Sequence, residues 1–407
     1  MKGIEIKSFG NTWDGRKALC WTITNGSGAQ LSLTDFGARI TGICVPDRDG
    51  RMEDVVLGFD TAEEFTQKGR YFGTTVGRYA NRLAGASFRL NGSVYKLYAN
   101  KGTNSLHGGK SGFDDKIWKA DITGEDSIRF TYESADGEEG YPGKMDVTVC
   151  YRFTEENEVE ITYRAVSDKD TIINLTNHAF YNLKGHGNGS ILGHKLKLYS
   201  SFFTPVNADM VPDGSILPVK GTVMDFTGMR SIGEQIDKTD EQLRLAEGYD
   251  HNYILQKEER GSLSKAAEVV EPESGRTMTV FTDQPGIQFY SGNLMKPCTG
   301  KGGREYGKRD AFCLEAQCFP NSMEVTHFPT PVLRANDTYE QKTVYRFGIC
   351  VIRKRGNRFA WGESKNRDGR KKPKLEKVSV VFYGISVSYT IVFVQLPSAL
   401  RMGIFVL

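Results

Sequence analysis

The stretch MDVTVCYRFTEENEVEITYRAV (residues 145–166) decides the fold class. Apolar and polar residues alternate in its first half, and the alternation resumes after Glu155, Glu156 and Asn157. Successive side chains of a strand point to opposite faces of a sheet, so a period of two predicts strands with one buried face. The stretch therefore predicts a β-hairpin. Its expected buried residues are Val147, Val149, Tyr151 and Phe153 in the first strand and Val159, Ile161, Tyr163 and Ala165 in the second.

Similar alternation, interrupted by glycine and aspartate, runs along most of the chain. Further strands are expected at residues 29–45, 127–133, 194–199, 277–282 and 342–347. Helical patterns are few and short, at residues 61–67 and 231–246. Short strands with frequent turns and little helix predict an all-β protein, a large antiparallel β-sandwich with few short helices.

Charge is unevenly distributed along the chain, whose net charge is +3. Residues 348–407 contain twelve Lys or Arg and three Asp or Glu (12 − 3 = +9), so residues 1–347 carry 3 − 9 = −6. An acidic body disfavours nucleic acid and phosphate-rich partners. Residues 1–347 show no break in composition and are predicted to form one β-sandwich domain, followed at 348–407 by a basic, then apolar C-terminal extension of unknown structure.

The extension contains an uncharged run at residues 378–400 that is long enough to span a bilayer. Three interpretations stay open: a membrane anchor, an added pair of strands, or sequence never selected for folding, such as read-through past a normal end. Val, Ser, Tyr and Phe are frequent in the run and favour strand over helix, which argues against a helical membrane anchor.

Seven cysteines without a C-x-x-C pair predict neither a disulfide framework nor a zinc ribbon, and mostly buried thiols are expected. The first residues, MKGIEIKSFGNTWDG, contain no apolar segment of the secretory kind, which predicts a cytoplasmic location. A hydrophobic content of 39% with 25% charged residues is typical of a globular protein with a sizeable core.

Two stretches carry residues suited to acid–base chemistry. NLTNHAFYNLKG (174–185) places His178 among asparagines and aromatics, and FCLEAQCFPNS (312–322) places Glu315 in an otherwise apolar strand. Histidine titrates near neutrality, although a lone histidine in a strand is more often a hydrogen-bonded core residue. Burial of Glu315 is costly unless it is paired or functional, and it would raise the pKa of the carboxyl toward the range of a general base. A structural ion pair is the alternative for Glu315.

Three further polar stretches contain candidate ligand-binding residues. GRYANRLAG (77–85) contains Asn81 and Arg82, whose guanidinium offers a fixed fork of donors, or it is a surface turn. TNSLHGG (103–109) contains His107, followed by glycines that let a ligand approach the backbone. GYDHNYIL (248–255) contains Asp250, either a turn residue or an acceptor for sugar hydroxyls.

Other chemistries fit the sequence less well. The six histidines lack H-E-x-x-H or another close ligand spacing, so no metal is predicted. GKGGREYG (300–307) resembles neither a P-loop nor a dinucleotide fingerprint, and no G-x-S-x-G elbow is present. A glycosidase stays open, because Asp250 and Glu315 could serve as its two carboxylates.

Taken together, the motifs resemble the aldose 1-epimerase family, also called galactose mutarotases. The matching stretches, in family order, are GRYANRLAG, NSLHGG, GFDDKIW, DGEEGYPG, NLTNHAFYNL, YDHNYIL, GIQFYSGN, GKGGREYG, CLEAQCFPNS and FPTPVLRANDTYEQKTVYRFG. They cover nearly all of residues 1–347. No single motif decides the resemblance, but their number and order do.

The resemblance implies a cofactor-independent enzyme on a large β-sandwich that interconverts the α and β anomers of free aldohexoses such as D-galactose and D-glucose. It implies that Glu315 is the general base for the C1 hydroxyl and His178 the general acid for the ring oxygen. Sugar-holding roles are implied for the residues Asn81, Arg82, His107, Asp250 and Gln288. No cofactor or metal is expected, and a monomer or a homodimer is expected.

The sequence also departs from the family pattern. Residues 179–181 read Ala-Phe-Tyr where the family often has a hydroxyl-bearing residue and other aromatics, a change expected to affect the pocket wall. Family members usually stop near residues 342–347, so the extension resembles an appended or translated non-coding segment that we expect not to pack with the sandwich.

Two other functions remain as alternatives. An epimerase of phosphorylated hexoses is disfavoured by the acidic body, and a non-catalytic sugar-binding module would need neither His178 nor Glu315. For the enzyme, we expect these two side chains to face each other across a sugar-sized gap, with Arg82, His107 and Asp250 around its rim.

Overall fold

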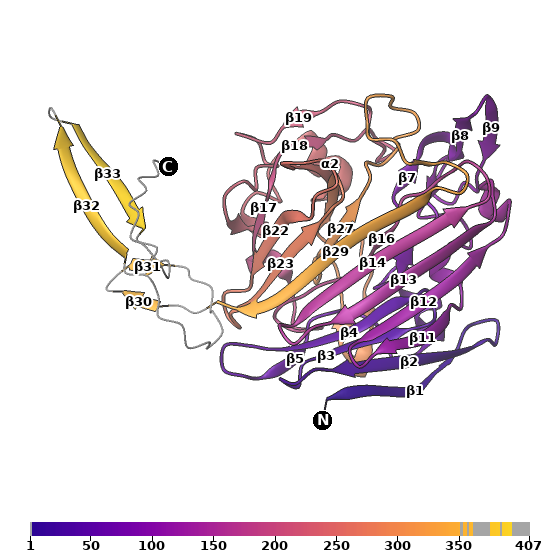
Figure 1. Ribbon diagram of the computed structural model, residues 1–407, viewed down its shortest axis with the longest axis horizontal. Helices are drawn as coiled ribbons and strands as arrows, with labels where there is room; N and C mark the ends of the chain where they lie inside the picture. The colour runs from indigo at the N-terminus through magenta and orange to yellow at the C-terminus, as the bar shows by residue number, and fades with distance from the viewer. Residues whose placement is uncertain (1, 351–352, 356–357, 361–374, 383–384, 393–407) are drawn as a thin grey trace, which may run out of the picture. The chain divides into compact units, whose positions relative to one another are not determined.

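The computed structural model describes residues 2–350 and four strands of the extension, at 353–355, 358–360, 375–382 and 385–392. Strands predominate in these residues and helices are short (Figure 1). The strands of the large sheets pair in antiparallel order, as in the adjoining pairs of β13, β14 and β29. The predicted all-β, antiparallel fold class is confirmed.

The predicted hairpin is present as β13 (Met145–Phe153) and β14 (Glu158–Ser167), with the expected apolar residues buried on one face. The hairpin lies within a nine-stranded sheet of order β11-β12-β13-β14-β29-β23-β22-β17-β20. The remaining strands of this sheet are β11 (Lys119–Gly124), β12 (Ser127–Ser134), β17 (Lys195–Leu198), β20 (Arg230–Ser231), β22 (Ser264–Val270), β23 (Arg276–Thr282) and β29 (Thr338–Ile349).

Two five-stranded sheets accompany the large one. The N-terminal sheet runs in chain order through β1 (Gly3–Asn11), β2 (Lys17–Thr24), β3 (Gln30–Thr34), β4 (Arg39–Pro46) and β5 (Met52–Asp54). The other has the order β19 (Leu217–Pro218), β18 (Ser200–Thr204), β21 (Asp250–Leu255), β24 (Gly286–Tyr290) and β27 (Cys313–Gln317). The predicted strand at 29–45 is therefore two strands, β3 and β4.

Short two-stranded ladders connect these sheets and hold loops. They are β7 (Arg82–Leu83) with β10 (Ser105–Leu106), β6 (Thr75–Val76) with β16 (Thr176–Asn177), β8 (Ser87–Leu90) with β9 (Ser93–Lys96), β15 (Thr171–Ile172) with β28 (Val332–Leu333), and β25 (Cys298–Thr299) with β26 (Glu305–Tyr306). Two of them, β7–β10 and β6–β16, carry predicted site residues at or beside their ends.

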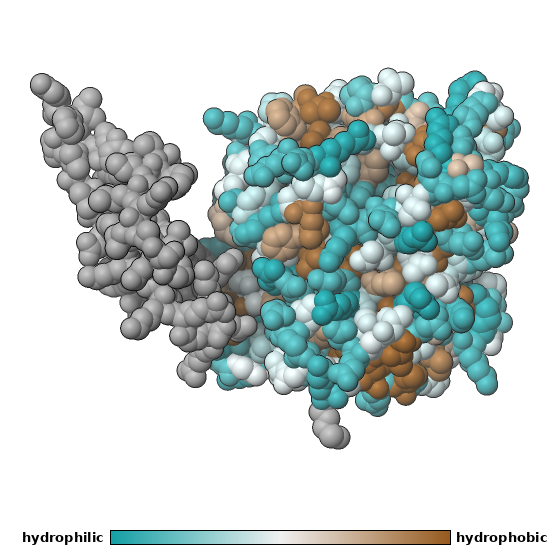
Figure 2. Space-filling model, viewed as in Figure 1, coloured by the Kyte–Doolittle hydropathy of each residue, from teal (hydrophilic) through white to brown (hydrophobic). Residues whose placement is uncertain are grey.

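The main hydrophobic core draws buried residues from all three large sheets. Leu31 of β3, Tyr151 of β13 and Phe289 of β24 belong to one apolar cluster. Each sheet therefore buries one face against another sheet, as in a sandwich, and each such side chain contributes about 1.5–3 kcal/mol by leaving water. The surface in Figure 2 is mainly hydrophilic, with scattered apolar side chains.

The helix predictions were correct in one case and partly wrong in the other. At 61–67 the structure has α1 (Ala62–Lys68), whose N-cap Thr61 accepts a hydrogen bond from the Glu64 N–H. At 231–246 it has a 3-10 turn, Ile232–Glu234, and then α2 (Glu241–Ala246). Asp240 has an extended backbone, and its carboxylate accepts hydrogen bonds from the N–H groups of Gln242 and Leu243, so the helix begins there. Other 3-10 turns are Ala84–Ala86, Phe113–Asp115, Glu138–Gly140, Ile191–Gly193 and Lys301–Gly303.

Strand β29 passes the predicted domain boundary by two residues, and Ile349 still pairs with Arg276. In the extension, β30 (Arg353–Arg355) pairs with β31 (Arg358–Ala360), and β32 (Leu375–Phe382) pairs with β33 (Ile385–Val392). The remainder of the uncharged run lies outside the described residues. Within the described part of the chain, no helix is long and apolar enough to cross a membrane. The division at 347/348 stays a prediction.

Candidate active site

His178 lies on a segment that is held between other strands. β16 pairs with β6 just before it. The His178 N–H donates to the Thr74 carbonyl (3.0 Å), and the Gly73 N–H donates to the His178 carbonyl (2.9 Å). Three residues later Tyr181 bridges to Phe312, which precedes β27. These main-chain bonds fix the backbone of His178 beside the strand that carries Glu315.

Glu315 lies in the middle of β27, all of whose residues are buried. Its register partner on β24 is Gln288, and β24 pairs in turn with β21, which begins at Asp250. The Gln288 side-chain amide donates to Oδ1 of Asp250 over 2.7 Å. Three predicted residues thus lie on three adjacent strands of one sheet.

Asn81, Arg82 and His107 come together through the β7–β10 ladder. The His107 N–H donates to the Asn81 carbonyl (3.0 Å), and the Asn81 N–H donates to Nδ1 of His107 (3.1 Å). Because Nδ1 accepts a hydrogen bond, the neutral His107 ring carries its proton on Nε2. Asn81 and His107 have φ values of 64° and 53°, the left-handed region that non-glycine residues adopt at a cost and often at functional sites.

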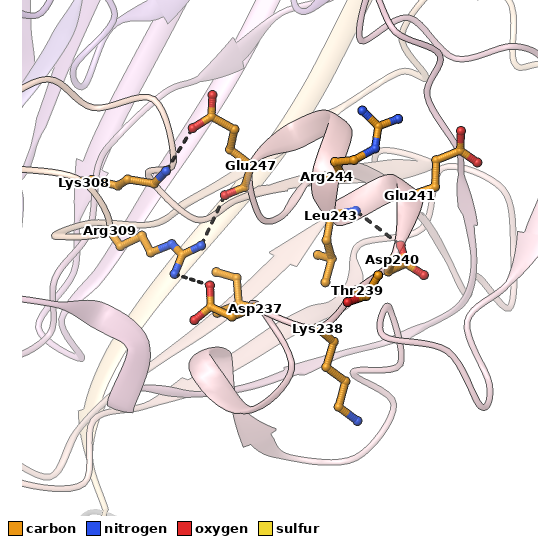
Figure 3. Close-up of a pocket in the computed structure, with 11 residues that line it drawn as sticks. Asp237, Lys238, Thr239, Asp240, Glu241, Leu243, Arg244, Glu247, Lys308 and Arg309 are labelled. Atoms are coloured by element: carbon orange, nitrogen blue, oxygen red, sulfur yellow. Dashed lines mark hydrogen bonds and ion pairs between the residues drawn. The ribbon is translucent and has the colours of Figure 1, made fainter.

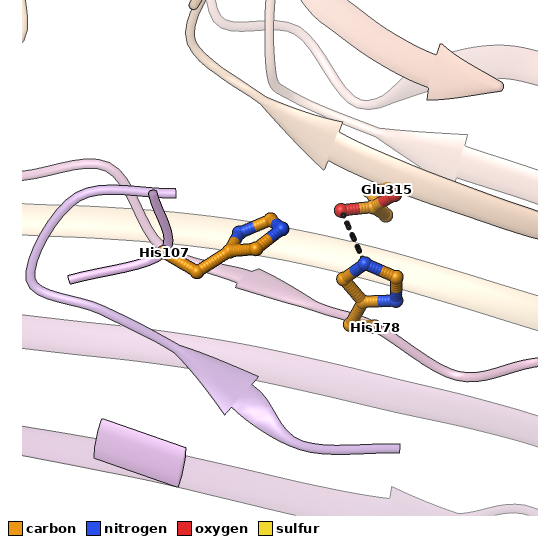
Figure 4. Close-up of side chains that lie close together, drawn as sticks. All are labelled: His107, His178 and Glu315. Atoms are coloured by element: carbon orange, nitrogen blue, oxygen red, sulfur yellow. Dashed lines mark ion pairs between the residues drawn. The ribbon is translucent and has the colours of Figure 1, made fainter. Parts of the chain in front are cut away.

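His178 and Glu315 face each other directly. Nε2 of His178 lies 3.6 Å from Oε2 of Glu315, and the two side chains are only 8% and 3% exposed (Figure 4). Burial raises the pKa of the Glu315 carboxyl well above its usual value, with the charge of Asp250 adding to the rise and Arg82 opposing it. Burial also lowers the pKa of His178 to about 4. Burial therefore disfavours both the carboxylate of Glu315 and the imidazolium of His178 until polar groups of a ligand solvate these charges.

The prediction that a sugar-sized gap separates these two side chains is wrong. At 3.6 Å they are in contact, with His107 beside them in Figure 4. O1 and O5 of an aldose are bonded to the same carbon, so an acid and a base that lie this close can reach both oxygens from one side. The chemistry does not require groups on opposite walls.

All seven predicted site residues belong to one connected group. His107 lies near both members of the pair, and burial, followed by the charges of His178 and Arg82, lowers the pKa of His107 well below its usual value. Arg82 donates through its main-chain N–H to Oδ1 of Asn81 (2.9 Å). The Arg82 Nε is buried without a hydrogen-bond partner among the described residues, so it is a donor available to a ligand.

Within the described residues, one group of three side chains could hold a metal ion: His107, His178 and Glu315. Their ligand atoms lie within 4.8 Å of one another. The set does not suit a metal well. A metal on Nε2 of His107 would need that nitrogen deprotonated and Nδ1 protonated, whereas Nδ1 already faces the Asn81 N–H. The absence of a metal remains a prediction.

Three residues around the site were missed or undervalued by sequence reasoning. Gln317, two positions after Glu315 and so on the same face of β27, donates to Oε1 of Gln288 (3.2 Å). Tyr71 and Phe180 place their rings beside His178. Strand periodicity could have identified Gln317, but aromatic residues in apolar runs look like any core residue.

A surface hollow of about 770 Å³ lies elsewhere, around α2 (Figure 3). In it Lys308 pairs with Glu247 (2.9 Å) and Arg309 with Asp237 (2.8 Å). None of the predicted site residues lines this hollow. We therefore assign the chemistry to the buried pair and not to this open surface.

Comparison with known proteins agrees with this site. A profile described as aldose 1-epimerase matches residues 19–346. The chain belongs to the aldose 1-epimerase family. Galactose mutarotase of Bos taurus is 39% identical over 324 residues, covering 79% of this chain and 92% of the relative. Aldose 1-epimerase of Escherichia coli (strain K12) is 33% identical over 336 residues, covering 82% of this chain and 96% of the relative.

Solved structures in this aldose 1-epimerase family share the fold. The crystal structure of the GalM/aldose epimerase homologue from C. elegans has a TM-score of 0.75 at 29% identity and covers 81% of this chain and 98% of its own. The crystal structure of galactose 1-epimerase from Lactobacillus acidophilus NCFM has a TM-score of 0.74 at 25% identity and covers 86% of this chain and 99% of its own. The predicted family, fold class and mutarotase activity, that of an isomerase acting on carbohydrates, are confirmed.

Proposed function

We propose that this chain interconverts the α and β anomers of free aldohexoses, with Glu315 as general base and His178 as general acid. The observation that carries the proposal is the buried contact of 3.6 Å between Nε2 of His178 and Oε2 of Glu315, in a site with no other acid–base pair at that range among the described residues. A sugar acetal needs one proton removed and one delivered at neighbouring oxygens, which this pair supplies.

The reaction proceeds through the open-chain aldehyde. Glu315 takes the proton from the C1 hydroxyl while His178 gives one to the ring oxygen O5, and the C1–O5 bond breaks. Rotation about C1–C2 presents the other face of the aldehyde. His178 then removes the proton from the C5 hydroxyl, O5 attacks C1, and Glu315 returns a proton to O1. No electron is lost or gained, so no redox cofactor is needed.

When the pair holds a single proton, the raised pKa of Glu315 and the lowered pKa of His178 both favour that proton on the carboxyl. The working form, a carboxylate with an imidazolium, contains the same single proton. Transfer across 3.6 Å therefore prepares the pair without exchange with solvent, once sugar hydroxyls help to solvate the two charges.

Binding roles follow from the unused hydrogen-bonding groups. Arg82 and the Nε2–H of His107 are donors, whereas Asp250 is an acceptor whose carboxylate is oriented by Gln288. Asn81 fixes both Arg82 and His107. Two donors together with a carboxylate acceptor match the paired donor and acceptor character of sugar hydroxyls.

Polarimetry on fresh α-D-galactose tests the proposed function. The protein should accelerate the approach to the equilibrium rotation, and D-glucose should also be a substrate. A protein that binds galactose without changing the rate would be the sugar-binding module, and a preference for a hexose phosphate would favour the phosphorylated substrate. The same preparation, run by analytical ultracentrifugation, distinguishes a monomer from a homodimer, both compatible with the cytoplasmic location proposed here.

We also propose that the catalytic domain ends with β29 and that the extension is dispensable. Cys350 is the last residue that the structure describes before the separately paired strands of the extension. A chain truncated after Cys350 should keep kcat/KM within about twofold, because every predicted site residue lies before it. Limited proteolysis should remove the extension before it cuts the body; an intact extension on a digested body would refute this division.

A further inference from the structure

The imidazole of His178 interacts with its own main chain, but no other described residue gives it an orienting hydrogen bond. Its Nε2 faces Glu315, but its Nδ1 is buried and has no hydrogen-bond partner in any other described residue. In catalytic and metal-binding histidines the second nitrogen commonly bonds to a carboxylate or carbonyl, which sets the tautomer and the ring orientation. Another feature must keep Nε2 directed at the reacting oxygens.

Two aromatic rings lie nearly parallel to this imidazole. The Phe180 ring centroid lies 5.1 Å from that of His178 with an interplanar angle of 15°, and the Tyr71 centroid lies 6.2 Å away at 21°. Phe72 stacks in turn on Phe180 at 4.0 Å and 9°. Tyr71 also contacts the His107 ring at 4.8 Å. The imidazole is thus held by contacts with aromatic ring faces and not by hydrogen bonds from other described residues.

The rings themselves are firmly held. The buried Arg39 guanidinium donates through Nη1 to the carbonyls of Arg70 (2.9 Å) and Phe72 (2.6 Å), one on each side of Tyr71. Phe180 is only 5% exposed and lies in an apolar cluster with Phe72. Phe180 cannot move away from His178 without disturbing its buried cluster, and the Tyr71 ring cannot do so without losing its contact with His107.

We propose that Tyr71 and Phe180 are positioning residues for His178, holding its imidazole toward Glu315 and stabilising its cationic form through their ring faces. Flat neighbours restrict rotation of the ring about its last side-chain torsion. An aromatic face attracts a cation, more strongly where water is excluded, so the rings favour the imidazolium in a site whose burial otherwise disfavours it. The catalytic part of this inference rests on the proposed role of His178.

The rate should respond to loss of the Phe180 ring. Phe180→Leu keeps an apolar side chain and should lower kcat by roughly 30-fold, the size expected of a desolvated cation–aromatic contact, with KM changed less than about twofold. Phe180→Tyr, which restores a ring, should recover kcat to within about threefold of the parent. Tyr71→Leu should lower kcat in the same way, and Tyr71→Phe should not.

Phe59→Leu is the matched control. Phe59 is buried in the same apolar cluster and packs against Phe72, but it makes no ring contact with His178 within the described residues. It should lose stability as Phe180→Leu does, while kcat stays within about twofold of the parent. Equal losses of kcat in Phe59→Leu and Phe180→Leu, or a rise in KM in place of the fall in kcat, would overturn the proposal.

Nuclear magnetic resonance of ring-labelled histidine gives a readout independent of turnover. In the parent, His178 should show one sharp Cε1–H signal, shifted upfield by the neighbouring rings; in Phe180→Leu the signal should move downfield and broaden, and Phe59→Leu should leave it unchanged. A parent inactive on every sugar but with this His178 signal would refute the proposed function and leave the positioning intact. An unchanged signal in Phe180→Leu would refute the positioning alone.

Discussion

The pair of His178 and Glu315 contrasts with a second buried histidine–glutamate pair, His194 and Glu271. These two residues flank the register pair of Lys195 on β17 and Val270 on β22. Both histidines are buried, and in each case burial lowers the pKa to about 4. By residue type and burial alone the two pairs are alike.

The two pairs differ in the donors around the carboxylate. Glu271 accepts main-chain N–H groups from Glu273 (2.9 Å) and Ser274 (2.6 Å). Burial alone would raise the pKa of its carboxyl, but hydrogen bonds from Ser274 and Glu273 hold that pKa below its usual value. Oε2 of Glu315 has no hydrogen-bond partner among the described residues, and the Glu315 pKa is raised.

The histidines differ in the same sense. Nε2 of His194 accepts the Leu183 N–H over 2.9 Å, so its lone pair holds the main chain. Nε2 of His178 faces only the Glu315 carboxylate at 3.6 Å. Nδ1 lacks a partner in both histidines, so the two pairs are separated by the bonds of Nε2 and of the carboxylate. Where these atoms are bonded to the backbone they stabilise the fold, and where they are left unbonded they are available for proton transfer.

The largest effect should come from replacing Glu315, with the same replacement of Glu271 as its control. Glu315→Gln should lower kcat by roughly 10² to 10⁴-fold with little change in sugar affinity, as for loss of a general base. Glu271→Gln is the matched control and should keep kcat within about twofold, because its carboxylate only holds the main chain. Polarimetry on α-D-galactose measures both, and an undiminished rate in Glu315→Gln would remove the role assigned to that residue.

The pH dependence of kcat/KM should show the shared proton of the His178–Glu315 pair. Below about pH 4 His178 takes up a second proton, and above the raised pKa of Glu315 the shared proton is lost. The rate should therefore fall about tenfold per pH unit below the pKa of His178 and above the raised pKa of Glu315, with a plateau between them. An acid limb near 6.5, the ordinary value for histidine, would show that burial does not control His178.

The smallest predicted effect concerns stability and reverses the order of the two variants. Glu271→Gln should lower the free energy of unfolding at pH 7 by about 1–3 kcal/mol, because an amide cannot accept both main-chain N–H groups through charged oxygens. Since the folded pKa of Glu271 is depressed, the wild-type advantage should be present above the unfolded value of about 4.3 and disappear as pH falls. Urea unfolding at pH 7 and pH 3 measures this.

Glu315→Gln provides the opposite case in the same unfolding series. A carboxyl whose folded pKa is raised destabilises the fold increasingly as pH rises from its unfolded toward its folded pKa. Its replacement by an amide removes this cost, so stability at pH 7 should be unchanged or higher. If instead Glu315→Gln unfolds more easily than Glu271→Gln, Glu315 is a structural residue and the contrast between the pairs fails.

Much of the fold could be predicted from local patterns. The hairpin of β13 and β14 follows from a period of two that one buried face imposes, and Thr61 predicts the start of α1. The helix expected at 231–246 was only partly correct, because Asp240 caps α2 and the helix starts there, an effect that hydrophobic periodicity does not detect. Gln317 was within reach of strand periodicity, whereas Tyr71 and Phe180 were not.

The sequence by itself determined the antiparallel β architecture, the family and the identity of the polar residues, because periodicity and motif order are properties of the linear chain. Only the tertiary structure decided that Glu315 touches His178, that His107 keeps its proton on Nε2, and that Glu271 is tied to the backbone while Glu315 is not. The reason is physical: proton chemistry depends on burial and on which donors reach each atom, and both are set by segments far apart in sequence.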